Sequence, residues 1–153
     1  MLVYFFGRKI HRSKKLLKFA LEVCRQVSFL KKQAEVSFIF VSDIEIRKIN
    51  QKFLNHHYFT DVISFSYPLP PNHSLKKEKN FPLGDIYISV DTAARQSREG
   101  GHFLFQELAL LIVHGLLHLA GYDDQNPADK KRMFARQKQL LKKIDPSLTP
   151  KNI

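Results

Sequence analysis

The order of apolar and polar positions predicts alternating strands and helices along most of the chain. Short runs rich in β-branched and aromatic residues predict four strands, at residues 2–6, 36–41, 62–67 and 84–90. Apolar residues at helical spacing predict five helices, at residues 13–30, 42–53, 91–100, 103–120 and 126–143. The proline-rich segment 68–82 is expected to be a loop between two strands.

Three helix starts carry cap signals. Ser42 precedes Glu45 by three residues, which is the spacing of a capping box. Asp91 is expected to cap the next helix, and Asn126 is followed by Pro127, a favoured first residue of a helix. The helix at 103–120 is apolar on nearly all sides, so we expect it at the centre of the fold.

These elements predict an α+β fold of one domain over residues 1–153: a small mixed four-stranded sheet packed with about five helices. The buried central helix is expected to carry metal ligands, as in zincin-like proteins. A lone cysteine, Cys24, suits a reducing compartment, and its place on an apolar helix stripe predicts a core residue. The apolar N-terminal run is too short for a signal sequence and no run is long enough to span a membrane, so we expect a cytoplasmic protein.

The charge balance narrows the choice of partners. Lys and Arg number 25 and Asp and Glu 14, which gives a net charge of +11. Such a surface favours a polyanion, most often a nucleic acid or an anionic membrane. The outer side of the last helix is especially basic and predicts a face for a nucleic-acid backbone, although a solvated helix face would have the same composition.

The most informative motif lies at the end of the apolar helix. His114 and His118 are four residues apart and therefore share one helix face. Gly121 permits a sharp turn that would bring a third ligand back to the two imidazoles. Asp124 stands ten residues after His114, as in the extended zincin pattern, and Asp123 is the competing third ligand.

Two imidazoles, a carboxylate and a water molecule satisfy the tetrahedral preference of Zn²⁺. The sequence therefore predicts one zinc ion, held by His114, His118 and Asp124, with Asp123 beside the site. Peptidases of this pattern carry Glu directly after the first His as the general base. Here that position is Gly115, which argues against proteolysis.

The motif at residues 114–123 resembles the signature of the YbeY family of bacterial endoribonucleases and rRNA maturation factors. The segments 83–89 and 60–65 are similar to two further strands of that family. The resemblance implies a zinc-dependent, single-strand-specific endoribonuclease that takes part in 16S rRNA 3′-end maturation and ribosome quality control. It also implies single-stranded rRNA and the small ribosomal subunit as partners.

The chain departs from the family pattern at two places that bear on the site. Asp124 stands where the family usually has a third His, and Leu54 stands where it typically has an Arg thought to serve the phosphate. Asp85 is a candidate for orienting a ligand histidine through a hydrogen bond, without binding the metal itself. Candidates for contacting the substrate RNA are His56, His57, Arg95, Arg98, Lys130 and Arg132.

Two alternatives to an active nuclease stay open at this point. Leu54 and Asp124 are consistent with an RNA-binding ribosome-assembly factor whose zinc is structural. A metallopeptidase is the third alternative, against which Gly115 and the positive charge both argue.

Overall fold

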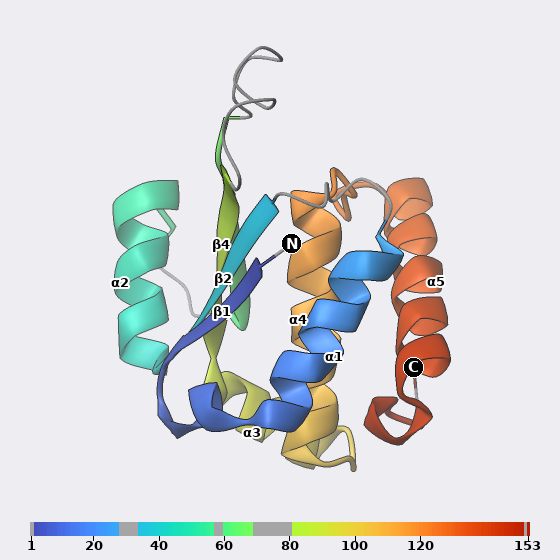
Figure 1. The fold of residues 1–153 in the computed structure, drawn as a ribbon. Coiled ribbons are helices and arrows are strands. Elements are labelled where there is room, and N and C mark those ends of the chain that lie inside the picture. Colours follow the sequence, from blue (N-terminus) through green and yellow to red (C-terminus); the bar gives the residue numbers. More distant parts are fainter. Residues whose placement is uncertain (1, 28–33, 57–59, 69–80, 152) are drawn as a thin grey trace.

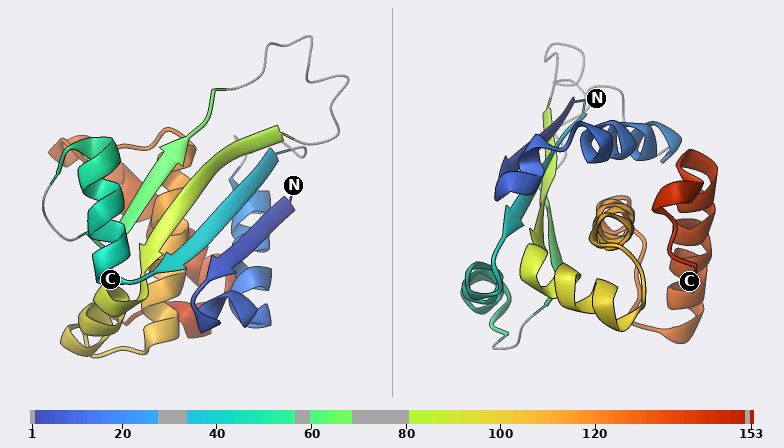
Figure 2. Two further views of the ribbon diagram at one scale, coloured as in Figure 1. Left: turned by 90° about the vertical axis from the view of Figure 1, so that its left-hand side faces the viewer. Right: turned by 90° about the horizontal axis from the view of Figure 1, so that it is seen from below.

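Four strands form one mixed sheet with helices on both faces (Figures 1 and 2). The computed structural model describes residues 2–27, 34–56, 60–68, 81–151 and 153. The strands are β1 (Leu2–Gly7), β2 (Ala34–Val41), β3 (Val62–Ser66) and β4 (Phe81–Ser89). Their order across the sheet is β1-β2-β4-β3, with β1 and β4 parallel to β2 and β3 antiparallel to β4. The predicted mixed four-stranded sheet is therefore confirmed.

Five α-helices surround the sheet, as the sequence predicts. They are α1 (Lys14–Gln26), α2 (Asp43–Leu54), α3 (Val90–Glu99), α4 (Leu104–Leu119) and α5 (Pro127–Ile144). Within the described ranges, two short 3₁₀ helices, η1 and η3, lie at Lys9–Arg12 and Pro146–Leu148. Of the five α-helices given above, α2 lies on one face of the sheet, while α4 covers the other face and is itself flanked by α1, α3 and α5 (Figure 2).

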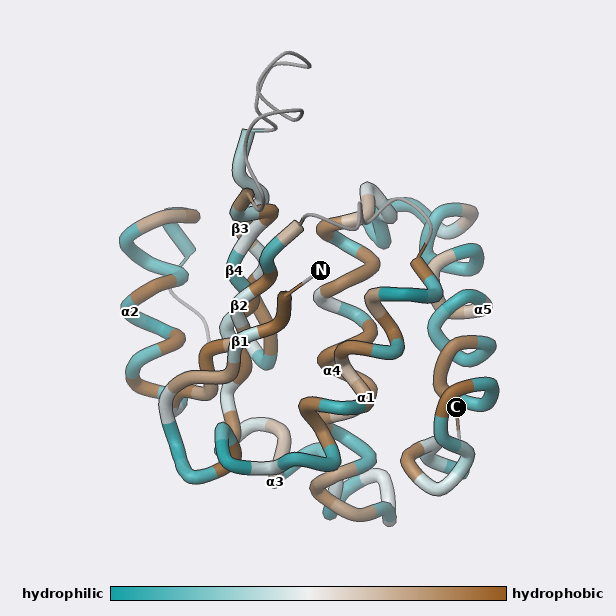
Figure 3. Tube along the Cα trace, in the orientation of Figure 1, coloured by the Kyte–Doolittle hydropathy of each residue, from teal (hydrophilic) through white to brown (hydrophobic). Residues whose placement is uncertain are grey.

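Helix α4 is the centre of the core, as its uniformly apolar sequence predicts. Leu108, Ile112 and Leu116 are fully buried on it. Burying a side chain of this size stabilises the fold by roughly 1.5–3 kcal/mol relative to leaving it exposed. Figure 3 shows the contrast with α5, whose apolar positions face α4 and whose polar positions face away. Cys24 on α1 is also part of this core, as predicted.

The cap signals hold at two of the three predicted helix starts. Ser42 and Glu45 form a complete capping box, and Asn126 caps α5 with a proline in its first turn. The prediction for α3 is wrong by two residues, because Ser89 is the cap and accepts a hydrogen bond from the backbone N–H of Thr92. Asp91 instead lies in the first turn, where it accepts hydrogen bonds from the Asp43 N–H and the Arg8 guanidinium.

Two other predicted limits differ from the structure. The first helix ends at Gln26 rather than at residue 30, and residues 28–33 lie outside the described residues. Phe81 and Pro82 belong to β4 rather than to a loop, because β4 starts three residues before the predicted strand. Phe81 is buried there, and residues 69–80 of the predicted loop lie outside the described residues.

The described helices do not include a single one that is both long and apolar enough to span a membrane. Only α3 and α4 taken together pass a test of length and composition, and they are bent by 116° at the break between them. Most of the apolar residues of α4 are buried against the sheet and the other helices, with Phe105 as an exposed exception.

Candidate metal centre

The end of α4 turns the chain back sharply. The Gly121 N–H donates to the His118 carbonyl and the Tyr122 N–H to the Leu117 carbonyl, which is the hydrogen-bond pattern of a Schellman motif. This motif needs a left-handed residue just after the helix, and Gly121 provides it with a φ of 88°. The turn directs residues 122–124 back towards the histidines of the last helical turns.

The turn brings His114, His118 and Asp124 together. Their ligand atoms all lie within 4.8 Å of one another. The Nε2 atoms of His114 and His118 are 3.1 Å apart, and the Asp124 carboxylate oxygens lie 3.6 Å from the first and 3.9 Å from the second. The three residues that the sequence singled out therefore converge on one point at the C-terminal end of α4.

Both imidazoles are oriented by hydrogen bonds at their other nitrogen. His114 Nδ1 lies 3.1 Å from the side-chain oxygen of Gln137 on α5, and His118 Nδ1 lies 3.1 Å from the Tyr122 carbonyl. Both partners are acceptors, so each Nδ1 carries the proton and each Nε2 presents a lone pair. Metal-binding histidines are commonly held by an outer hydrogen bond of this kind.

The donor set fits a zinc ion. Two Nε2 lone pairs that face each other at 3.1 Å repel unless a cation lies between them. Ligand atoms about 2.0–2.2 Å from a tetrahedral zinc lie roughly 3.3–3.6 Å apart, close to the spacing observed here. Burial, followed by the proximity of His118, lowers the pKa of His114, which favours the neutral imidazole that a metal requires.

Asp123 has a different task from its neighbour. Its Oδ1 accepts hydrogen bonds from the backbone N–H groups of Asp124 and Gln125, at 2.7 and 3.2 Å. This local turn fixes the backbone from which the Asp124 side chain projects. Of the two candidate carboxylates, Asp124 is the one whose oxygens lie near both imidazoles.

A cleft of about 620 Å³ opens in front of the three donors. It lies between α2, β3 and the end of α4, and its size suits a small ligand or part of a chain. The lining residues besides the donors are mostly polar: Asn50, Leu54, His56, Thr60, Asp61, Val62, Ile63, Ser64 and Gln125. Leu54 therefore lines the candidate site, and residues 57–59, with the candidate His57, lie outside the described residues.

Gly115 has a packing role beside the first histidine. A Cβ atom at this position would lie 2.6 Å from the Ile86 Cγ2 atom and 3.2 Å from the Ser64 hydroxyl. The Ser64 hydroxyl also donates a hydrogen bond to the Gly115 carbonyl, at 3.2 Å. The absence of a side chain lets α4 approach β3 and β4 closely, and it leaves no room for the glutamate that a zinc peptidase carries there.

Two of the predicted auxiliary residues lie elsewhere. Arg95 on α3 is engaged with the Asp43 carboxylate at 2.5 Å and with the Thr92 hydroxyl at 2.8 Å. The Asp85 carboxylate accepts a 2.6 Å hydrogen bond from the Tyr67 hydroxyl. Asp85 follows Gly84 and precedes Ile86, which meet α4, so strand alternation places its side chain on the other face of the sheet.

The remaining candidates for RNA contact divide by distance from the donors. Lys130 lies over the Phe134 ring, 5.5 Å from its centroid, and that ring is 6.3 Å from the His114 ring. Arg132 is ion-paired with Asp129 in a neighbouring cleft beyond the turn. Arg98 lines a third cleft at the end of α3. Among these three cations, Lys130 is therefore the one near the donor cluster, because Phe134 lies close to both Lys130 and His114.

The sequence predictions include no role for Gln137 or Asp61. Gln137 is a buried polar residue on the apolar stripe of α5, between Met133 and Leu140, and this position was the signal that could have revealed it. Asp61 lines the cleft and is held by the Val62 N–H and the Gln96 amide, at 2.8 and 2.9 Å. Gln137 therefore contacts a donor directly, whereas Asp61 belongs to the wall of the cleft.

The fold and the donor cluster together define an α+β protein with a candidate metal centre at the end of its central helix. The family model described as "Endoribonuclease YbeY" matches residues 7–145, and the chain belongs to this family. The resemblance found in the sequence is therefore confirmed.

Individual relatives agree with the family model. The chain is 42% identical over 116 residues to the protein named endoribonuclease YbeY from Elusimicrobium minutum. This match covers 76% of the present chain and 78% of the relative. It is 44% identical over 111 residues to the protein of the same name from Bacillus licheniformis, which covers 71% and 70% respectively. The solution structure of TM1509 from Thermotoga maritima is similar with a TM-score of 0.59 and 28% identity, over 93% of this chain and 88% of that one.

Proposed function

We propose that this protein is a zinc-dependent endoribonuclease that cleaves single-stranded rRNA, acting as one domain over residues 1–153. The observation that carries the proposal is the convergence of two oriented imidazoles and one carboxylate in a polar cleft, in a chain of an endoribonuclease family. In cells we expect it to act in the cytoplasm on the small ribosomal subunit, in 16S rRNA 3′-end maturation and ribosome quality control.

The chain's own residues would bind and orient the reacting groups. His114, His118 and Asp124 would hold the zinc ion, and Gln137 keeps the His114 ring in the productive tautomer. When bound there, zinc would supply a nucleophile from water near neutral pH and polarise the scissile phosphate. His56, Thr60 and Gln125 line the cleft around the donors, so an RNA strand in the cleft would contact these side chains.

The test combines substrate, chelator and one variant. Purified protein is incubated with single-stranded rRNA fragments and with casein, with and without a chelator, beside the His114→Ala variant. We expect RNA cleavage that the chelator stops, that zinc restores and that the variant lacks. RNA binding and bound zinc without cleavage would favour the assembly-factor alternative, and casein digestion would contradict both.

The ends of the RNA products identify the attacking group. Attack by the ribose 2′-hydroxyl leaves a 2′,3′-cyclic phosphate, whereas attack by water leaves a linear monophosphate. A substrate with a single 2′-deoxy nucleotide at the cleavage position separates the two routes, because it blocks only the first.

A further inference from the structure

Most of the net positive charge lies on two neighbouring helices. Helix α1 carries four Lys or Arg residues and one acidic residue, and α5 carries seven and one. The two helices therefore hold nine of the eleven net positive charges of the chain. The remaining residues are close to electrically balanced.

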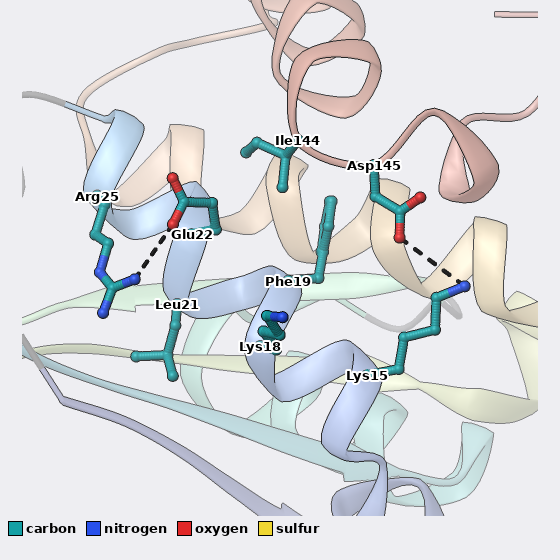
Figure 4. Close-up of a pocket in the computed structure, with 8 residues that line it drawn as sticks. All are labelled: Lys15, Lys18, Phe19, Leu21, Glu22, Arg25, Ile144 and Asp145. Atoms are coloured by element: carbon teal, nitrogen blue, oxygen red, sulfur yellow. Dashed lines mark hydrogen bonds and ion pairs between the residues drawn. The ribbon is translucent and has the colours of Figure 1, made fainter.

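The two helices are joined side by side. The Arg136 guanidinium on α5 donates to the Gln26 carbonyl at the end of α1, at 3.0 Å, and the Lys143 ammonium donates to the Gln26 side chain, at 2.7 Å. A groove of about 480 Å³ runs between α1 and the end of α5 (Figure 4). We call the exposed cations of these helices the basic face: Lys14, Lys15, Lys18, Arg25, Lys130, Lys131, Arg132, Lys138, Lys142 and Lys143.

Some of the groove cations have local counter-ions. Lys15 pairs with Asp145 at 3.9 Å and Arg25 with Glu22 at 3.3 Å. Lys18 lines the same groove and has no ion-pair partner among the described residues. Three carboxylates (Glu22, Asp129 and Asp145) pair with cations of the basic face, which has ten cations in all. The face therefore keeps a strongly positive field, which attracts a polyanion.

The basic face is almost free of exposed aromatic side chains. Over the part of the chain that the structure describes, α1 exposes no large apolar side chain and α5 exposes one, Phe134, which is 44% exposed. Proteins that bind single strands stack the bases on aromatic rings, whereas paired RNA is recognised mainly through its phosphates and hydroxyls. Cations without rings therefore suit the backbone of a base-paired stem.

Phe134 lies at the end of the basic face that adjoins the metal centre. Its ring centroid is 6.3 Å from that of His114, and the Lys130 ammonium lies 5.5 Å from it. An exposed ring with a cation above it is equipped to stack one unpaired base and neutralise its phosphate. Among the described residues, the basic face therefore has an exposed aromatic ring beside a cation only at the end near His114, and cations without rings elsewhere.

We propose that a base-paired RNA stem docks on the basic face while the unpaired strand beside it stacks on Phe134 and enters the cleft at His114 and His118. The proposal rests on the proposed RNA-cleaving function and gives it a substrate class, an unpaired segment flanked by a stem. The stem would hold the protein in register with the cleavage point without being read for sequence.

The experiment compares two RNAs and two triple variants. One RNA is a hairpin with a single-stranded tail, and the other is the tail alone. The basic-face variant is Lys18→Gln, Lys138→Gln and Lys142→Gln. The matched control is Lys9→Gln, Lys48→Gln and Lys151→Gln, which removes the same charge from exposed positions elsewhere. Affinity is measured by fluorescence anisotropy over a salt series, and folding is checked by thermal melting.

We expect the basic-face variant to bind the hairpin RNA about tenfold more weakly at 0.1 M salt and to show a salt dependence reduced by up to about 2–3 in slope. Its cleavage of the tail alone should match the wild type, as should both activities of the control. Equal losses in both variants, equal losses on both RNAs, or no loss would overturn the proposal. Failure of the wild type to cleave either RNA would instead overturn the proposed function.

A second variant tests the metal end of the face. Phe134→Leu should weaken binding of the tail alone by about 5- to 150-fold, because a stacked base contributes roughly 1–3 kcal/mol. The same variant should retain the stem-dependent part of the affinity, measured as the ratio of hairpin to tail binding. Unchanged binding of the tail would contradict a stacking role for Phe134.

Discussion

Two clefts of similar size differ in how their charged groups are held. In the cleft at the end of α4, the side chains of His114, His118 and Asp124 are only 17%, 29% and 35% exposed and converge on one point. In the groove between α1 and α5, the side chains of Lys15 and Arg25 are 56% and 69% exposed and pair with nearby acids. The cleft at the end of α4 therefore holds its charged groups in one defined geometry. The groove between α1 and α5 has only an excess of positive charge in common among its side chains.

The difference indicates that the cleft at the end of α4 is suited to binding a metal and to catalysis, whereas the groove is suited to attracting a polyanion. Partly buried imidazoles that are oriented by other elements cannot relax when a partner is lost, so each change there should have a large effect. Exposed pairs in water contribute little by themselves, since solvent and salt screen them. Substitutions in the cleft should therefore change metal binding and catalysis, while single substitutions in the groove should change little.

The largest expected effect is that of His114→Ala. Loss of one ligand should lower zinc affinity and RNA cleavage by more than about 100-fold, because changes in the outer hydrogen bonds of metal ligands alone cost about 10- to 100-fold. Zinc affinity by chelator competition and cleavage rates measure the two losses. The control is His11→Ala, which removes a half-buried histidine of η1 that is not part of the donor cluster and should leave both unchanged.

Gln137 should have the next largest effect, and it acts through His114. Gln137→Met keeps the size of the side chain but removes the acceptor of the Nδ1 proton, so zinc should bind about 10- to 100-fold more weakly. Gln137→Glu restores an acceptor and should recover zinc affinity and the absorption spectrum of the cobalt-substituted protein. If the Met and Glu variants bind zinc equally, Gln137 has only a packing role.

The sequence predicts the element order and the donor cluster better than it predicts the auxiliary residues. His114, His118 and Asp124 lie within eleven residues, so the helix period and one glycine turn suffice to bring them together. The contact between Gln137 and His114 joins residues 23 apart on different helices, and local periodicity does not reveal such pairs. Arg95 was expected near RNA because its charge is visible in the sequence, whereas its partner, Asp43, lies 52 residues away.

Asp43 is a charged side chain whose hydrogen bonds are expected to stabilise the fold although it lies outside both clefts. Burial raises the pKa of Asp43, but hydrogen bonds from the Arg95, Ser89 and Thr92 side chains outweigh burial and hold the pKa at about 2. Because the folded-state pKa lies below the ordinary value of 3.8, the carboxylate stabilises the fold above about pH 4. This stabilisation is lost as the pH falls from about 4 towards 2.

Asp43→Asn should therefore lower the free energy of unfolding at pH 7 by about 1–2 kcal/mol. The effect is smaller than the pKa shift alone implies, because Arg95 is exposed and solvent screens its interaction with Asp43. The variant should also lose less stability than the wild type between pH 4 and 2. Urea unfolding at several pH values measures both. Glu99→Gln, at an exposed acid on the same helix as Arg95, should leave the pH profile unchanged.

The smallest expected effect comes from a single groove residue. Lys15→Gln removes the 3.9 Å pair with Asp145 and should change the free energy of unfolding by less than about 0.5 kcal/mol. It should leave zinc affinity unchanged. A decrease in the free energy of unfolding of more than about 1 kcal/mol would contradict the distinction between the two clefts. It would mean that the pair of Lys15 and Asp145 is held in a defined geometry, like the groups of the cleft at the end of α4.

The most direct test of the candidate metal centre compares its two neighbouring carboxylates. Asp124→Asn removes the charge that lies near both imidazoles, while Asp123→Asn keeps the oxygen that accepts from the backbone of the turn. Zinc affinity is measured for both variants beside the wild type, with zinc content by elemental analysis. We predict one zinc per chain in the wild type, at least tenfold weaker binding in Asp124→Asn, and near wild-type binding in Asp123→Asn. Weaker binding in Asp123→Asn alone, or no zinc in the wild type, would contradict the assignment of His114, His118 and Asp124 as the metal ligands.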